Sequence, residues 1–142
     1  MIALDTNILA RLVTNDDPVQ ARQAALLIDA GGALFVPMSV ILELEWVLRG
    51  AYALDKSAVT RSFEALLSIK NMTFERAADV QHAIELYLHG FDFADALHHC
   101  GAKGCTVFAT FDDKFRKLAV KSHLMPQVIS PNLINIAPKE AK

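Results

Sequence analysis

Residues 31–52, GGALFVPMSVILELEWVLRGAY, contain the pattern that decides the fold class. The run ALFVP, residues 33–37, is short, apolar and closed by a proline, which is typical of a buried strand. The segment that follows, residues 38–52, is longer and predicts a helix with apolar side chains around most of its circumference. A strand that leads directly into a helix is one βα unit, so this stretch indicates an α/β fold.

The same alternation extends in both directions. Residues 1–4, MIAL, predict a buried strand, and Asp17 and Asp55 are start signals for the helices expected within residues 15–32 and 54–70. Further along, the pattern predicts helices over residues 75–90, 92–104 and 112–121 and strands over residues 72–74, 105–110 and 127–130. Strands separated by helices predict a parallel sheet with helices on both faces. No linker or repeat divides the chain, so we expect one domain over residues 1–137 and a frayed tail over residues 138–142.

The composition limits the classes of function. With 142 residues, 53% hydrophobic and 21% charged, the chain is typical of a globular protein that buries a real core. A net charge of −2 provides no general basic surface, so nucleic-acid binding would need a local patch or a metal ion. The chain has two cysteines, no basic signal-peptide segment and no apolar run long enough for a membrane span. These features predict a cytoplasmic protein without membrane contact.

Acidic residues stand where buried elements end. Asp5 closes the first predicted strand and Asp112 closely follows the strand over residues 105–110. Ligands of parallel sheets bind at the carboxyl ends of the strands. Winding residues 38–52 at about 100° per residue places Glu45 as an exposed partner of Arg49, and places Glu43 within an apolar arc. An acid in an apolar arc is costly unless it is paired, so Glu43 either faces a cleft that holds a cation or lies partly exposed at the edge of the arc.

Helix capping is an alternative explanation for the remaining acids. Asp92 is well placed to cap a helix, with Asp95 in its first turn, and Asp112 could cap the last helix, with Asp113 in its first turn. Considered together, however, converging carboxylates repel one another unless a divalent cation joins them. An all-oxygen ligand set suits Mg²⁺ or Mn²⁺, and a water held by such an ion can hydrolyse a phosphodiester.

Four motifs resemble those of PIN-domain ribonucleases, and more narrowly those of VapC-type toxins of type II toxin–antitoxin systems. They are LDTN at residues 4–7, ILELEWVL at 41–48, DFADAL at 92–97 and ATFDDKF at 109–115. The resemblance spans nearly the whole chain. It implies an α/β/α sandwich with a central parallel sheet, and an Mg²⁺- or Mn²⁺-dependent endoribonuclease that cleaves tRNA or ribosomal RNA loops.

The resemblance also implies roles for individual residues. The catalytic and metal-binding acids would be Asp5, Glu43, Asp95 and Asp112. Thr6, Asn7 and Thr110 match polar residues that support such a site, and Asp92 and Asp113 are extra acids of open function. The last helix offers possible contacts to RNA phosphates, although a solvated polar face explains the same residues: Lys114, Arg116, Lys117 and Lys121. The implied partners are a cognate VapB-like antitoxin, whose basic side chain would reach the carboxylates, and a second copy in a homodimer.

Three other classes of function fit the sequence less well. A receiver-type phosphoacceptor domain shares the sheet and an acidic pocket, but it would need paired acids after the first strand. A catalytically silent PIN-like binding module would be expected to have lost some of the four acids. A zinc site at residues 98–100 and Cys105 lacks ligand geometry because neighbouring helical residues point about 100° apart. Buried thiols and surface histidines are the expectation there.

Overall fold

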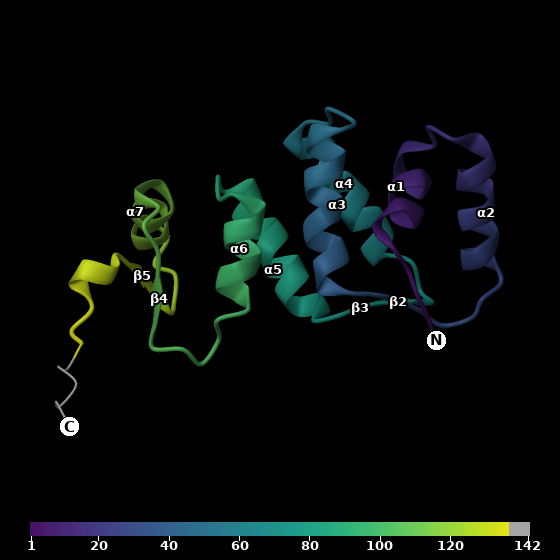
Figure 1. Ribbon diagram of the computed structural model, residues 1–142. Coiled ribbons are helices and arrows are strands. Elements are labelled where there is room, and N and C mark those ends of the chain that lie inside the picture. The colour runs from purple at the N-terminus through teal and green to yellow at the C-terminus, as the bar shows by residue number, and fades with distance from the viewer. Residues whose placement is uncertain (137–142) are drawn as a thin grey trace, which may run out of the picture.

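The computed structural model describes residues 1–136, in which helices alternate with short strands (Figure 1). The helices are α1 (Thr6–Thr14), α2 (Pro18–Asp29), α3 (Met38–Gly50), α4 (Lys56–Leu67), α5 (Ala77–Leu88), α6 (Phe93–Cys100) and α7 (Asp113–Lys121), and a 3₁₀ turn, η1, spans Pro131–Leu133. The strands are β1 (Ile2–Ala3), β2 (Leu34–Val36), β3 (Met72–Phe74), β4 (Val107–Ala109) and β5 (Gln127–Ile129). The predicted tail, residues 138–142, lies outside the described residues.

All strand pairs are parallel. β1, β2 and β3 form a three-stranded sheet in that order, with Phe35 opposite Ala3 on one side and Thr73 on the other. β4 and β5 form a separate parallel pair. Figure 1 shows this pair at the opposite end of the molecule from β1, with α5 and α6 between them. The predicted α/β class is confirmed and the architecture is consistent with a PIN-like α/β/α fold, although the sequence does not predict the division of the strands between two sheets.

Local signals determine where several helices begin. The side chain of Asp17 accepts a hydrogen bond from the backbone N–H of Gln20 at 3.1 Å, and that of Asp55 accepts one from Ala58 at 2.8 Å. These bonds satisfy amide groups that the first helical turn leaves without partners. At the other end of α2, Gly31 has a φ of 77°, a backbone conformation that side-chain-bearing residues rarely adopt. The caps predicted at Asp17 and Asp55 are therefore confirmed, and Gly31 provides the stop after α2.

Two helices differ from the sequence-based expectation. No helix is predicted over residues 6–14, yet α1 follows β1 with only Leu4 and Asp5 between them. Asp5 lies two residues after the strand and is already the cap of α1, so no turn signal separates the two elements. The helix predicted over residues 92–104 ends earlier, at Cys100.

A core of apolar side chains fixes the position of α6 relative to the other helices. The rings of Phe63 on α4 and Phe93 on α6 stack with centroids 5.2 Å apart, and the Tyr87 ring on α5 meets Phe93 edge-on at 5.5 Å. Helix α3 also packs against α6. Because these contacts are buried, they hold the polar faces of α3 and α6 in one defined arrangement.

The predicted phase of α3 is wrong. The buried stripe comprises Ile41, Leu44 and Leu48, and Glu45 belongs to it with only 5% of its surface exposed, whereas Glu43 lies on the exposed side. The expected pair with Arg49 exists at 2.8 Å between Nε and Oε1, but its acidic partner is not exposed. Burial of Glu45 is tolerated because the Tyr87 hydroxyl also donates a hydrogen bond to Oε1, at 3.2 Å.

The expected distribution of histidines and thiols is only half right. His98 is exposed and Cys100 is buried, as predicted, but His99 is buried and Cys105 is exposed. The His99 Nε2 atom lies 2.8 Å from the backbone oxygen of Pro126, a contact that supplies the partner a buried imidazole needs. Among residues 1–136, no helix combines the length and the apolar character needed to cross a membrane.

Candidate active site

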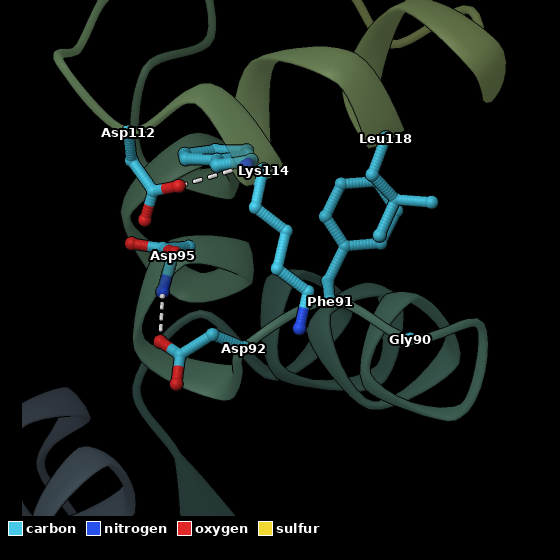
Figure 2. A pocket seen from close by; sticks show the side chains of 8 residues that line it. Gly90, Phe91, Asp92, Asp95, Asp112, Lys114 and Leu118 are labelled. Atoms are coloured by element: carbon cyan, nitrogen blue, oxygen red, sulfur yellow. Dashed lines mark hydrogen bonds between the residues drawn. The ribbon is translucent and has the colours of Figure 1, made fainter.

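Three acids from two helix starts line one small pocket. Figure 2 shows Asp92 and Asp95 from the beginning of α6, Asp112 from the beginning of α7, and Lys114 extending into the same space. Gly90, Phe91, Phe115 and Leu118 form the remaining walls. The pocket has a volume of about 70 Å³, and a water molecule in the liquid occupies about 30 Å³. It therefore has room for an ion with bound water and none for a nucleotide.

Two of these acids cap helices and also face the pocket. Asp92 Oδ2 accepts a hydrogen bond from the backbone N–H of Asp95 at 3.1 Å, and Asp112 Oδ1 accepts one from Phe115 at 2.9 Å. Asp112 is held further by its own N–H, which donates to the Thr110 hydroxyl at 3.1 Å. Each cap uses one carboxylate oxygen, and within the described part of the chain the second oxygen accepts no hydrogen bond. Capping and ligand binding are therefore compatible roles here.

Asp95 has an unfavourable electrostatic environment. Partial burial raises the pKa of its carboxyl group, and the neighbouring charges of Asp92 and Asp112 raise it further, while His98 acts in the opposite direction. Along residues 1–136, Asp95 forms no ion pair. A divalent cation in this pocket would favour the ionised form of Asp95 and so relieve the effect of its surroundings.

A second cleft contains the other two predicted catalytic acids. Asp5, at the end of β1, and Glu43, on α3, line it together with Thr6, Asn7 and Tyr52. Asp5 Oδ1 accepts a hydrogen bond from the Thr6 backbone N–H at 2.7 Å. The Thr6 hydroxyl is buried and has no hydrogen-bond partner within the described residues.

A third cleft joins the other two. It has a volume of about 470 Å³ and shares Glu43 with the second cleft and Asp92 with the small pocket. Trp46 and Arg49 also line it. Glu45 also lines this cleft, but its carboxylate pairs with Arg49. The other acids follow one another along three adjoining clefts in the order Asp5, Glu43, Asp92, Asp95, Asp112. We refer to these five residues as the acidic row.

The acidic row is not a single closed cluster. Nowhere in residues 1–136 do three Asp, Glu, His or Cys side chains lie close enough together to hold a metal ion among them. The assignment of Asp5, Glu43, Asp95 and Asp112 as joint ligands thus stays a prediction. The donor set nevertheless fits a hydrated Mg²⁺ ion, because such an ion keeps several waters and is bound through one or two carboxylates. One or two of the pocket acids Asp92, Asp95 and Asp112 would hold it, with water filling the remaining positions.

The basic residues of α7 separate into two groups. Lys114 lines the acid pocket, whereas Arg116 pairs with Asp113 at 2.9 Å. Arg116 holds the pKa of the Asp113 carboxyl group below its ordinary value, and Asp113 lines none of the three clefts. Lys117 and Lys121 are exposed. Of the possible phosphate contacts, Lys114 is the one that this arrangement brings to the acids.

Sequence reasoning missed the part played by Trp46 and Arg49. The predicted helical phase places Trp46 in the apolar arc beside Glu43, and it places Arg49 in a solvent-exposed pair with Glu45. A signal was present, because Ile41, Leu44 and Leu48 have the spacing of a buried stripe. Choosing that stripe would have turned Glu43 and Trp46 together towards solvent.

Comparison with known proteins identifies a family. The family model described as PIN domain matches residues 2–121, a range that contains the whole acidic row. No curated protein matches the chain.

Proposed function

The chain belongs to the PIN domain family, whose members are generally metal-dependent nucleases, and from this premise we propose that it is an Mg²⁺- or Mn²⁺-dependent endoribonuclease. The observation that carries the proposal is the acidic row, in which Asp95 has no ion-pair partner among residues 1–136 although burial and the neighbouring carboxylates raise its pKa. A fold that needed Asp95 only for stability would gain from pairing it. The family match also favours this function over a receiver-type phosphoacceptor.

The residues of the site would divide the work as follows. One or two of the pocket acids Asp92, Asp95 and Asp112 would hold the ion, which when bound supplies a water more acidic than bulk water. Thr110 fixes the backbone of Asp112, and so keeps its carboxylate aimed at the pocket. Lys114 would bind a phosphate oxygen of the substrate. Glu43, which borders the large cleft, would orient the attacking water.

Cleavage of RNA in the presence and absence of metal tests the proposal. Excess EDTA should stop cleavage, and added Mg²⁺ or Mn²⁺ should restore it, because the available ligands are all oxygen atoms. Undiminished cleavage in EDTA, with the absence of metal confirmed, would overturn the mechanism. Metal-dependent cleavage that never occurs would favour the alternative of a catalytically silent binding module, which the open arrangement of the acids also suggests.

Glu43 and Glu45 provide a matched pair of variants on one helix. Glu43→Gln should abolish or strongly reduce cleavage, because its exposed carboxylate borders the clefts. Glu45 also lines the large cleft, but its carboxylate is engaged by Arg49 and Tyr87. Glu45→Gln should therefore retain kcat per folded molecule, and it should raise KM at most modestly, through Arg49. If Glu45 proves essential and Glu43 dispensable, the acidic row is assigned incorrectly.

We further propose that the protein is a VapC-type toxin neutralised by a VapB-like antitoxin. The motifs that resemble this class support the proposal, as do the exposed apolar side chains of Val19 and Leu26 on α2, which offer area to a partner or to a second copy. Expression of the protein alone should inhibit growth, and co-expression of a small neighbouring gene should relieve the inhibition. The toxin role is refuted if no neighbouring gene suppresses toxicity.

A further inference from the structure

Exposed aromatic side chains are concentrated beside the acidic row. All Phe, Tyr and Trp residues lie within the described part of the chain, and only Trp46 and Phe111 are exposed, by 65% and 87%. Trp46 stands three residues after Glu43 on α3, and Phe111 directly precedes Asp112. A single exposed apolar side chain needs no explanation, but both rings adjoin an acid of the site.

Trp46 differs from Phe111 because it lines a cleft. The cleft of about 470 Å³ contains Trp46 between the acids Glu43 and Asp92, whereas Phe111 lines none of the three clefts. Small-molecule sites typically have volumes of about 300–1,000 Å³, so this cleft admits a nucleotide. The acid pocket next to it, at about 70 Å³, admits only an ion and water. The large cleft therefore suits a nucleotide of the substrate, and the small pocket suits the ion and water beside its phosphate.

Arg49 supplies a cation at the same cleft. Its Nε donates a hydrogen bond to Glu45 Oε1 at 2.8 Å, and Glu45 is itself fixed by burial and by the Tyr87 hydroxyl. The hydrogen bond and charge of Glu45 raise the pKa of Arg49, so the guanidinium stays charged. Half of the Arg49 side chain, 51%, is exposed. Its terminal amino groups therefore have access to a phosphate while Nε is held in place.

We propose that Trp46 stacks on a base of single-stranded RNA and that Arg49 binds the adjoining phosphate, which places the next phosphodiester at the acidic row. This inference rests on the proposed function and adds the residue that positions the substrate. Stacking on an aromatic ring requires a base that is not already stacked in a duplex, and it is tolerant of sequence. The ring suits a base, the cation suits a phosphate, and the acids suit the metal ion beside the next phosphate, so the three features together fit one strand of RNA.

The fluorescence of Trp46 gives a direct measurement, since it is the sole tryptophan of the chain. The full chain in EDTA, which prevents cleavage, is titrated with a short single-stranded RNA. Saturable quenching is expected for this RNA. Neither the same RNA annealed to its complement nor an abasic strand of equal length should quench. Equal quenching by the abasic strand would overturn the stacking, and quenching that depends only on protein concentration would show that a second copy covers Trp46.

Kinetics of the variants provide the second measurement. Trp46→Ala should raise KM for single-stranded RNA by about 5- to 150-fold with little change in kcat, which corresponds to about 1–3 kcal/mol per stacked base. Trp46→Phe should retain most of the affinity because it keeps a ring. Leu88→Ala removes a comparably exposed apolar side chain from α5, away from the three clefts, and should change neither constant. Unchanged KM in Trp46→Ala would refute the inference.

The two proposals can fail separately. Saturable quenching by single-stranded RNA without metal-dependent cleavage would remove the nuclease and leave Trp46 as an RNA-binding residue. Metal-dependent cleavage without any effect of Trp46→Ala would leave the nuclease and remove the role of Trp46.

Discussion

Asp79 and Asp95 lie on two helices that pack together, yet their surroundings are opposite. Asp79 on α5 is 4% exposed and pairs with Arg76 at 2.7 Å and with Lys103. The hydrogen bond from Lys103 and the charges of both partners hold the pKa of its carboxyl group below its ordinary value. Asp95 on α6 has no such partner among residues 1–136, and its pKa is raised.

The difference shows how a structural acid can be distinguished from a functional one in the same fold. Two basic residues, Arg76 and Lys103, neutralise Asp79, so this fold can place cationic partners beside an acid near the α5–α6 interface. Asp95 instead lies near two further carboxylates, those of Asp92 and Asp112. A carboxylate whose ionised form is disfavoured is a cost to the folded state unless a ligand uses it.

Replacement of Asp95 is expected to have the largest effect. Asp95→Asn should reduce RNA cleavage by about 100-fold or more, the size of loss seen when a group that acts on the transition state is removed. In EDTA the variant should melt no lower than the wild type, because a repelling charge is gone. A thermal melt with and without Mg²⁺ measures this, and Mg²⁺ should stabilise the wild type more than the variant. A lower melting temperature in EDTA would make Asp95 a structural residue.

Replacement of Asp79 should give the opposite result. Asp79→Asn should lower the free energy of unfolding by about 1–3 kcal/mol, since it weakens two charge-assisted bonds at a buried group. Urea denaturation measures this loss. Cleavage per folded molecule should be unchanged, because Asp79 lines none of the three clefts. A large loss of activity in the folded variant would erase the distinction between the two acids.

A smaller difference is expected between the two acids of α3. Glu45→Gln should lower the free energy of unfolding by about 0.5–1.5 kcal/mol, because a buried carboxylate loses its charge-assisted bond to Arg49. Glu43→Gln should change it by no more than about 0.5 kcal/mol, as is usual at an exposed position. Urea denaturation of the two variants in EDTA compares them directly. Equal effects on stability would mean that burial does not separate Glu43 from Glu45.

The pH dependence of stability should differ in sign between Asp79 and Asp95. The folded pKa of Asp79 lies below its unfolded value, so its stabilising contribution is present above pH 3.8 and is lost as the pH falls. The folded pKa of Asp95 lies above 3.8, so in EDTA its ionisation destabilises the folded state as the pH rises through that range. Urea denaturation from pH 3 to 6 should therefore show opposite slopes when each Asn variant is subtracted from the wild type. Slopes of the same sign would contradict the comparison.

The starts of individual helices could be predicted from the sequence more readily than the way in which the helices pack against one another. Asp17 and Asp55 were recognisable as helix starts because a cap acts within three residues of its own position. The phase of α3 was harder to assign, because eight of the eleven positions from Met38 to Leu48 are apolar and the stripe of Ile41, Leu44 and Leu48 requires a buried Glu45. What decides the phase is Tyr87, which lies far along the chain and makes the burial of Glu45 tolerable.

The candidate site shows the same limit. Asp5 and Asp112 were placed at strand ends by local pattern alone, and the resemblance to PIN domains named all four acids. Their distribution over three clefts depends on how α3, α6 and α7 sit against one another, which is settled by contacts distant in sequence. The Thr110 hydroxyl accepts the N–H of Asp112 two residues later, and its role in supporting a catalytic site stays a prediction.

Asp92 and Asp112 cap α6 and α7 and also face the pocket. The first turns of these two helices should therefore respond to an ion that binds in the pocket. The amide protons of Asp95 and Phe115 donate hydrogen bonds to these two carboxylates. An ion that draws either carboxylate away would loosen its turn, and one that is held by the second oxygen would tighten it. Hydrogen exchange at these two amides, followed by NMR as Mg²⁺ is added, would therefore record the arrival of the ion without any substrate being turned over.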